Sequence, residues 1–277
     1  MLLGFNGATS MNYDLKTDIR LAEQTGFQLL EIWASKLYKY LENNSVADLV
    51  QRFERADVKP YSINSIEFIT FKQGEDYERI KIECRNLCKI ARELSCPNIV
   101  VVPSPTPPGA TEDGILAESV RVLQELSAIA AEYNINLAFE FLGFSHISVS
   151  TLDRCYRIVH ETDRPNIGLV LDTFHFYAGG SDVKDIEAVD KDKIFIFHIN
   201  DAEDRERSQL EDAHRLFPGE GVIPLIGILR SLKKIGYDNM ASIELFRPEY
   251  WELAPEELGR RSLLSMKQVL KRALDPA

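Results

Sequence analysis

The chain has 277 residues, of which 45% are hydrophobic and 27% are charged, and its formal net charge at pH 7 is −11. This composition is typical of a soluble globular protein and excludes collagen-like, intrinsically disordered and membrane-embedded chains. The acidic balance argues against nucleic acid as a partner, and against an acidic substrate unless a bound cation or a local basic pocket reverses the field.

The first residues, MLLGFNGATS, contain no basic region and no long apolar stretch. We therefore expect neither a signal peptide nor a membrane partner, and we predict a cytoplasmic protein. Among the four cysteines, Cys84 and Cys88 share one face of a predicted helix. No further metal ligands lie near them, so we interpret them as core residues rather than as part of a zinc site or a disulfide framework.

Short apolar runs alternate with longer amphipathic segments along the whole chain. The runs are rich in Ile, Val, Leu and Phe, and each has the length of a buried parallel strand. They cover Leu2–Asn6, Leu29–Trp33, Pro60–Ser65, Asn98–Val102, Asn136–Phe141, Ile167–Asp172, Ile194–Ile199 and Ala241–Phe246. The segments between them have helical periodicity, and helix starts are predicted near Thr151, Pro224 and Pro255.

Eight strand–helix units in a chain of this length predict an α/β fold, a single (β/α)8 TIM barrel that forms one domain over residues 1–277. The alternative is an open doubly wound sheet, which commonly carries a glycine-rich turn after its first strand. Here Gly-Ala-Thr-Ser follows Asn6, which is no such turn. Among the connections, Pro103–Gly109 is predicted to be a rigid connector, and the long polar stretch Asn200–Gly221 a lid over the barrel mouth.

The last four predicted strands each end on an ionisable side chain. These residues are Glu140, Asp172, His198 and Glu244. Any one of them alone could cap a helix or form hydrogen bonds in the core. A barrel would bring all four together at its carboxyl-terminal end, where TIM-barrel active sites lie. Because three buried carboxylates repel one another, the pattern predicts a bound cation.

The predicted ligand set constrains the identity of the metal. Three carboxylates and one imidazole are mostly oxygen donors, which suit Mn²⁺, Mg²⁺ or Co²⁺ in six-coordination. We favour Mn²⁺, and zinc with expanded coordination stays open. Four protein ligands on a six-coordinate ion would leave two positions free, as a substrate with adjacent carbonyl and hydroxyl oxygens requires.

Several segments resemble the xylose-isomerase-like TIM-barrel superfamily of sugar isomerases and epimerases, namely LAFEF, LVLDTFH, IFHIND and SIELFRPEY. Within it, FNGATS, GFQLLEIW, KPYSINSIEF and FPGEG extend a resemblance to inosose (2-keto-myo-inositol) isomerases along nearly the whole chain. The resemblance implies that Glu140, Asp172, His198 and Glu244 bind the metal. It also implies that Glu140 and Glu244 exchange protons with a polyhydroxy ketone of inositol metabolism.

Four more residues are candidates for contacts with the substrate. His175, which the resemblance matches, could donate to a substrate oxygen, or it could be a helix-start histidine bonded to backbone. Arg247 could bind substrate hydroxyls or hold Glu244, or form a surface ion pair. Arg215 could close over the substrate, although a solvated arginine is the more ordinary interpretation. Trp33 could form an apolar wall of the site or simply pack.

The predicted function is a divalent-metal-dependent isomerase or epimerase of a keto-cyclitol or keto-sugar, with 2-keto-myo-inositol as the favoured substrate. A metal-stabilised cis-enediolate would connect the two proton transfers. The alternative is a dehydroshikimate-type dehydratase of the same superfamily. An endonuclease IV-type repair enzyme is less favoured, because its additional metals need histidines from early strands and none precedes His146. The oligomeric state stays open.

Overall fold

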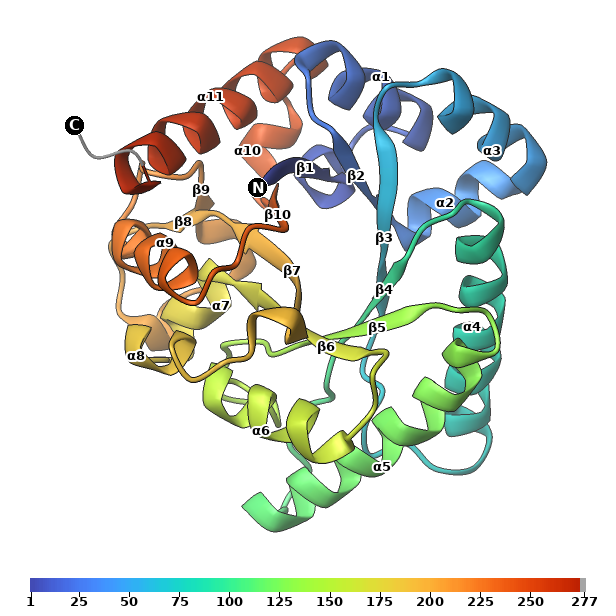
Figure 1. The fold of residues 1–277 in the computed structure, drawn as a ribbon, viewed down its shortest axis with the longest axis vertical. Coiled ribbons are helices and arrows are strands. Elements are labelled where there is room, and N and C mark those ends of the chain that lie inside the picture. The colour runs from blue at the N-terminus through green and yellow to red at the C-terminus, as the bar shows by residue number, and fades with distance from the viewer. Residues whose placement is uncertain (275–277) are drawn as a thin grey trace.

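The computed structural model describes residues 1–274. In it, eight parallel strands close into a barrel in the order β1-β10-β7-β6-β5-β4-β3-β2. Helices form a ring around the barrel, as Figure 1 shows in a view along it. The predicted (β/α)8 architecture is therefore confirmed.

All eight predicted strands are present. Their bounds are β1 Leu2–Asn6, β2 Leu29–Trp33, β3 Lys59–Ile66, β4 Asn98–Val101, β5 Asn136–Glu140, β6 Ile167–Asp172, β7 Ile194–Ile199 and β10 Met240–Ile243. The largest difference from prediction is at the last strand, which ends at Ile243, so that Glu244 lies one residue beyond it. Because barrel strands run parallel, all these carboxyl ends meet at one end of the barrel.

The helices around the barrel vary in length from single turns to 20 residues. They are α1 Leu15–Thr25, α2 Ala34–Leu41, α3 Val46–Arg55, α4 Gly74–Glu93, α5 Glu112–Ala131, α6 Leu152–Thr162, α7 Thr173–Ala178, α8 Val183–Ile186, α9 Leu225–Lys234, α10 Pro248–Trp251 and α11 Pro255–Leu274. Short 3₁₀ turns are η1 Gly7–Ser10, η2 Lys191–Lys193, η3 Arg207–Gln209 and η4 Asp212–His214. None of the helices described is both long enough and apolar enough to cross a bilayer.

Local sequence explains where several helices begin and end. Ser45 caps α3 through a capping box with Asp48, and Gly26, whose φ of 89° favours glycine, follows the last residue of α1 as its C-cap. The predicted start at Thr151 is confirmed, since α6 begins one residue later. Pro255 opens α11 as predicted, whereas Pro224 lies at the N-cap of α9, just before its first turn.

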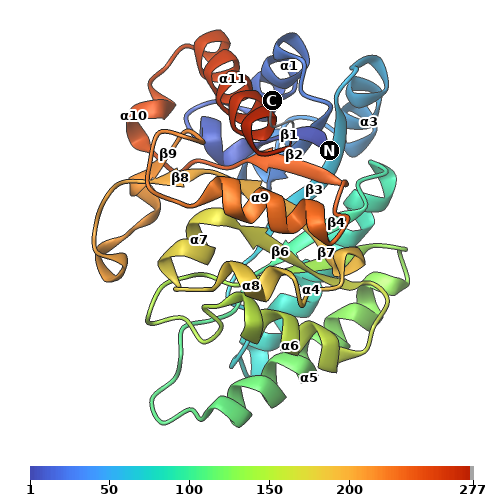
Figure 2. The ribbon, with the colours of Figure 1, turned by 60° about the vertical axis from the view of Figure 1, so that its left-hand side comes forward.

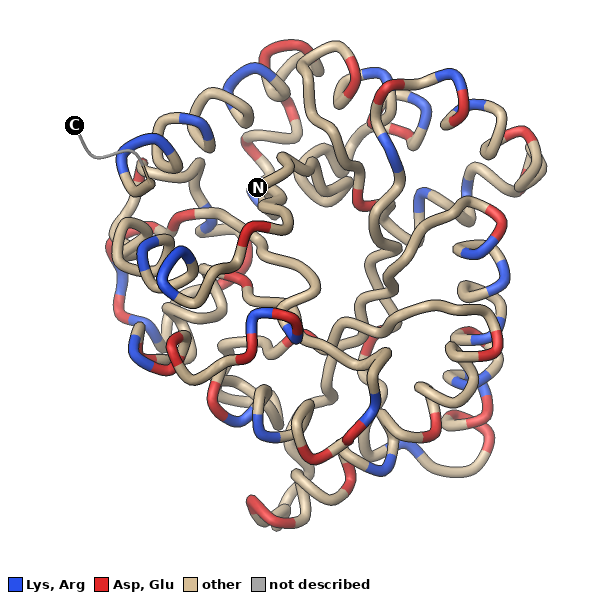
Figure 3. The backbone as a smooth tube through the Cα atoms, in the orientation of Figure 1, with Lys and Arg blue, Asp and Glu red and all other residues tan. Residues whose placement is uncertain are grey.

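Apolar side chains fill two regions. One is the inside of the barrel, lined by residues such as Val100, Ala138 and Ile196, and the larger one lies between the barrel and the helices. The four cysteines are buried and free, as their interpretation as core residues requires. Most lysines, arginines and acidic residues lie on the outer helices and loops (Figure 3).

The connection after β7 carries a small antiparallel pair, β8 Asp201–Ala202 and β9 Arg215–Leu216. Its position beside α9 and α10 is visible in Figure 2. The buried Asp201 carboxylate accepts hydrogen bonds from the backbone N–H groups of Gly219 and Ile223. These contacts join the two ends of the stretch predicted to be a lid, and β9 brings Arg215 to the barrel's carboxyl end, where it contacts Asp172.

Candidate metal centre

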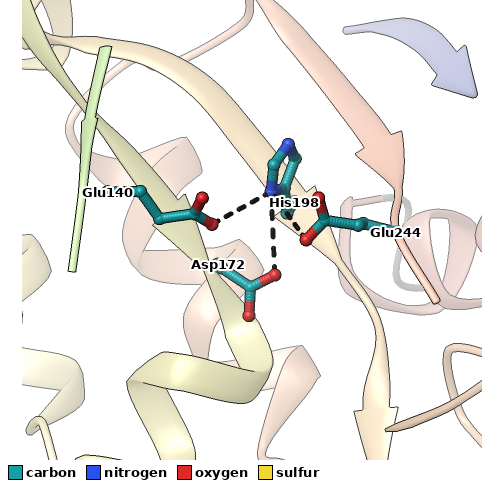
Figure 4. A group of neighbouring side chains, drawn as sticks. All are labelled: Glu140, Asp172, His198 and Glu244. Carbon is teal, nitrogen blue, oxygen red and sulfur yellow. Dashed lines mark hydrogen bonds and ion pairs between the residues drawn. The ribbon is translucent and has the colours of Figure 1, made fainter. Parts of the chain in front are cut away.

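The four predicted ligands converge at the carboxyl-terminal end of the barrel. Glu140 ends β5, Asp172 ends β6, His198 lies in β7, and Glu244 follows β10. Each offers one ligand atom, and these atoms all lie within 4.8 Å of one another. Figure 4 shows the three carboxylates pointing toward the imidazole.

His198 Nδ1 is the common point of the cluster. It lies 3.3 Å from Glu140 Oε1, 3.7 Å from Asp172 Oδ2 and 3.2 Å from Glu244 Oε2. Strand register explains the arrangement, because Asp172 is paired with His198 across β6 and β7. No side chain of the four is more than 5% exposed, so the cluster is almost completely removed from water.

Burial and mutual repulsion set the electrostatics of the acidic groups. Burial and the nearby charge of Glu244 raise the pKa of Glu140 to about 8. Burial alone would raise the pKa of Asp172 too, but the charge of Arg215 beside it holds that pKa below its usual range. His198 behaves oppositely, because the charges of Glu244 and Glu31 overcome burial and raise its pKa. The raised pKa of Glu140 reflects burial and repulsion between closely spaced carboxylates, which a bound cation would relieve.

The donor set fits a divalent cation. Three carboxylate oxygens and one imidazole nitrogen already lie close together, and a mostly oxygen donor set of this kind suits a divalent cation. The residues that would hold the ion are thus Glu140, Asp172, His198 and Glu244.

Three polar residues on the first strands contact this cluster, and the sequence analysis missed them. Asn6 on β1 and Asn64 on β3 each donate to Glu244 Oε1 at 2.9 Å. Glu31 on β2 lies 2.9 Å from His198 Nε2. For Asn6 and Asn64, the signal that could have found them is the one used for the ligands, because each is a polar residue near the carboxyl end of a strand. For Glu31, the signal is a single charged residue in the middle of an otherwise apolar strand.

Arg215 is fully buried, so the interpretation of a solvated arginine is wrong. Its Nη1 donates to Asp172 Oδ2 at 2.7 Å and to Glu244 Oε2 at 3.0 Å, and its Nη2 donates to His175 Nε2 at 3.0 Å. Asp212 accepts from Nε and Nη2. The side chain is held over the cluster because its charge is paired with three carboxylates, those of Asp172, Asp212 and Glu244.

His175 lies in α7, one turn after Asp172, and is buried. Its backbone N–H donates to Asp172 Oδ1 at 2.8 Å, as the helix-start interpretation requires. Burial, together with the neighbouring charge of Arg215, lowers its pKa to about 4 despite the attraction of Asp172, so the ring is neutral near pH 7. Because Nε2 accepts from Arg215, the hydrogen is on Nδ1, which is buried with no hydrogen-bond partner among the described residues.

A pocket of about 210 Å³ opens onto the cluster. Its lining includes Trp33, Glu140, His175, Arg215 and Glu244, together with Phe68 and Phe246. Trp33 packs edge-on against Phe246, with ring centroids 5.5 Å apart. The pocket therefore combines an apolar wall with two of the four candidate ligands, Glu140 and Glu244, and with further polar groups that include His175 and Arg215.

Arg247 is not among the residues that line this pocket. Its Nη1 donates to Glu203 at 2.7 Å, and its guanidinium lies over the Tyr250 ring. Arg247 thus joins α10 to the connection that carries Arg215, which matches the ion-pair interpretation. Of the other histidines, His146 and His160 are exposed, and His214 is half-buried in η4.

The chain was compared with protein families, curated proteins and solved structures. The family model described as xylose isomerase-like TIM barrel matches residues 19–269. Inosose isomerase of Bacillus velezensis is 40% identical over 93% of this chain and 92% of its own length. The crystal structure of the IOLI protein with a bound zinc atom superposes with a TM-score of 0.96 at 36% identity, covering 99% of this chain and 100% of that one.

A relative with another activity is more distant. The 3-dehydroshikimate dehydratase of Pseudomonas aeruginosa is 27% identical over 94% of this chain, but over only 41% of its own length.

Proposed function

Because this chain belongs to the xylose isomerase-like TIM barrel family and is an enzyme, we propose that it is a divalent-metal-dependent isomerase or epimerase of a keto-cyclitol or keto-sugar. The favoured substrate is an inosose, 2-keto-myo-inositol. The observation that carries the proposal is the buried cluster of Glu140, Asp172, His198 and Glu244, two of which line the pocket, in a chain 40% identical to an inosose isomerase.

The two glutamates would perform the proton transfers. A divalent cation bound by the cluster would polarise the carbonyl of an α-hydroxyketone and so acidify the neighbouring C–H. Glu244 is held in place, since one oxygen accepts from Asn6 and Asn64 and the other from Arg215. Glu140 has a single hydrogen-bond partner among the described residues, His198, so one of its oxygens is left to take up a proton. Both glutamates line the pocket.

His175 and Arg215 would orient the substrate. The buried Nδ1–H of His175 lacks a partner, and a substrate oxygen in the pocket could satisfy it. Since an unmatched buried donor costs about 1–3 kcal/mol, pairing it would favour a ligand that presents an oxygen there. Arg215 would keep His175 in the tautomer that can donate. Trp33 would supply an apolar wall against the ring of the substrate.

The charges of the pocket favour an uncharged polyhydroxy ketone over an acidic substrate. Besides Glu140 and Glu244, the acidic residues Glu67 and Asp212 line the pocket, and Arg215 is the only arginine or lysine in its lining among residues 1–274. Its guanidinium is already engaged by Asp172, Glu244, Asp212 and His175. A dehydroshikimate-type substrate brings a carboxylate that would meet no free cationic side chain, which disfavours the dehydratase alternative.

The oxygen-rich ligand set favours Mn²⁺, with Zn²⁺, Co²⁺ and Mg²⁺ as further candidates. An assay in D₂O tests the proposal. Metal-loaded protein is incubated with a panel of inososes and ketohexoses, and NMR follows deuterium entry beside the carbonyl and the identity of the product. We expect exchange and isomerisation of an inosose. Exchange with no keto-polyol would overturn the proposal, and loss of water would identify a dehydratase instead.

Replacement of a proton-transfer group gives a sharper test. At saturating metal, Glu140→Gln is expected to lower the exchange rate by about 10²–10⁴-fold, because general acid–base catalysis contributes that much. Glu187→Gln is the matched control, since Glu187 is a surface carboxylate paired with Lys234. Equal rates for the two variants would remove Glu140 from the reaction.

A further inference from the structure

Glu31 is a buried carboxylate that the proton transfers described above do not use. It lies in the middle of β2 and is 0% exposed. Its Oε1 is 2.9 Å from His198 Nε2 and 3.3 Å from Asn6 Nδ2, while its Oε2 accepts from the Ser62 hydroxyl at 2.6 Å. Strand register places the donors Asn6 and Ser62 beside it, since Glu31 is paired with Asn6 on β1 and with Ser62 on β3.

The Asn6 amide determines the direction of these hydrogen bonds. Asn6 Oδ1 accepts the backbone N–H of Ala8 at 2.9 Å, so its Nδ2 is the group that faces Glu31. An amide nitrogen can only donate, which makes Glu31 Oε1 an acceptor. His198 Nε2 shares that oxygen and must therefore carry its hydrogen toward Glu31.

A proton held on Nε2 leaves the lone pair of neutral His198 on Nδ1. That is the nitrogen that faces Glu140, Asp172 and Glu244, at 3.2 to 3.7 Å. The opposite tautomer would place an N–H in the ligand cluster and the lone pair against Glu31, where two acceptors would face each other. Glu31 thus selects the one form of His198 that can act as a ligand in this cluster.

Stability of the barrel does not account for a carboxylate at this position. The barrel interior also holds a cluster of apolar side chains, among them Leu29, Val100 and Met240. Burying a charged group costs several kcal/mol compared with an apolar side chain of similar volume. A residue retained at that cost, with its oxygen aimed at a predicted ligand, serves the site rather than the packing.

We propose that Glu31 is a positioning residue for metal binding: it holds the proton of His198 on Nε2, orients the imidazole, and strengthens Nδ1 as a ligand. The proposal rests on the metal site of the proposed function. In this proposal the strands have two roles. The ligands lie on β5, β6, β7 and just after β10, and the residues that hold the ligands in place lie on β1, β2 and β3.

Metal affinity of the purified protein is the first test, with Mn²⁺ and Zn²⁺ titrated into chelator-treated wild type and Glu31→Leu by calorimetry. Leucine has a similar volume, but it offers no acceptor to the hydrogen on His198 Nε2. We expect the dissociation constants of the variant to rise by about 10- to 100-fold, the usual effect of losing an outer partner of a ligand.

Ser62→Ala is the matched control, because it removes a hydrogen bond to Glu31 and leaves the contact between Glu31 and His198 intact. We expect its dissociation constants to stay within about threefold of wild type, by contrast with the loss expected for Glu31→Leu. Equal affinity of wild type and Glu31→Leu would overturn the proposal. Absence of metal binding by wild type would overturn the metal site itself, so the two failures are distinguishable.

A second measurement needs no variant of Glu31 to fold. NMR of wild-type protein with ¹⁵N-labelled histidine, loaded with diamagnetic Zn²⁺, reports which ring nitrogen carries the hydrogen. His198 is assigned by the loss of its signals in His198→Asn. We expect a protonated Nε2 and a zinc-bound Nδ1, and zinc on Nε2 would overturn the proposal.

Discussion

At the scale of single residues, glycine allows two segments of the pocket wall to approach each other. A Cβ on Gly143 would lie 2.3 Å from the backbone oxygen of His175 and 2.6 Å from the nitrogen of Gly179. Both of these atoms are backbone, so nothing flexible could move aside. Gly143 therefore fixes the distance between the segment after β5 and α7, which carries His175.

Gly143→Ala is consequently expected to destabilise the protein by about 1–3 kcal/mol, the usual cost of overpacking. It should also displace α7 and weaken substrate binding. Gly227→Ala is the control, because a Cβ at this position in α9 meets only Val183 methyl groups at 4.0 Å. Alanine there should stabilise the helix by up to about 1 kcal/mol. Urea unfolding measures both, and a neutral Gly143→Ala would show that the two segments can separate.

At the scale of elements, a buried ion pair joins the first two helices to the turn that follows β1. Lys36 of α2 lies 2.8 Å from Asp18 of α1, and its Nζ also donates to the backbone oxygens of Gly7 and Ser10 in η1. Burial raises the pKa of Asp18 and lowers the pKa of Lys36, in spite of their mutual attraction. The pair is thus costly to separate, and it holds η1 at the end of β1 that carries Asn6.

Lys36→Met should therefore cost about 3–5 kcal/mol of unfolding free energy, because it leaves the Asp18 charge buried without a partner. The double variant Asp18→Leu/Lys36→Met should cost less than the sum of the two single changes, since no charge is left unpaired. Denaturant unfolding of all four proteins completes the cycle. A single change below about 1 kcal/mol would mean that water reaches the pair.

At the scale of the whole molecule, barrel closure makes the candidate site. β1 pairs with β10, so Asn6 contacts Glu244 although 238 positions separate them in the chain. The ligands thus come from strands on one side of the barrel and their supporting residues from strands on the other. A cation bound between them would join both halves of the fold.

Metal is accordingly expected to stabilise the entire barrel. A ligand present at 100 times its dissociation constant adds about 2.7 kcal/mol to the free energy of unfolding. For a domain of about 150–250 residues, that increase corresponds to a rise in Tm of roughly 5–10 °C. Calorimetric scans with Mn²⁺ and with chelator measure the difference. His198→Gln is the control and should show little shift. An equal shift in that variant would place the metal outside the cluster.

The amino-acid sequence by itself determined the strands, the barrel and the four candidate ligands. Each ligand stands at the end of an apolar run, and a parallel barrel leaves only one place where those ends can meet. The apolar pattern of a strand is a local property of the chain. This explains why seven of the eight predicted strands end within one residue of the observed strand.

Only the tertiary structure shows which contacts Arg215, Glu31 and Asn64 make with the candidate metal cluster. Arg215 belongs to a connection without strand or helix periodicity. Its burial depends on contacts with Asp172, which lies 43 positions earlier in the chain, and with Glu244, which lies 29 positions later. The contact between Glu31 and His198 spans 167 positions and exists only once the barrel closes. Side-chain direction at such contacts follows from strand register and barrel closure, which no local pattern encodes.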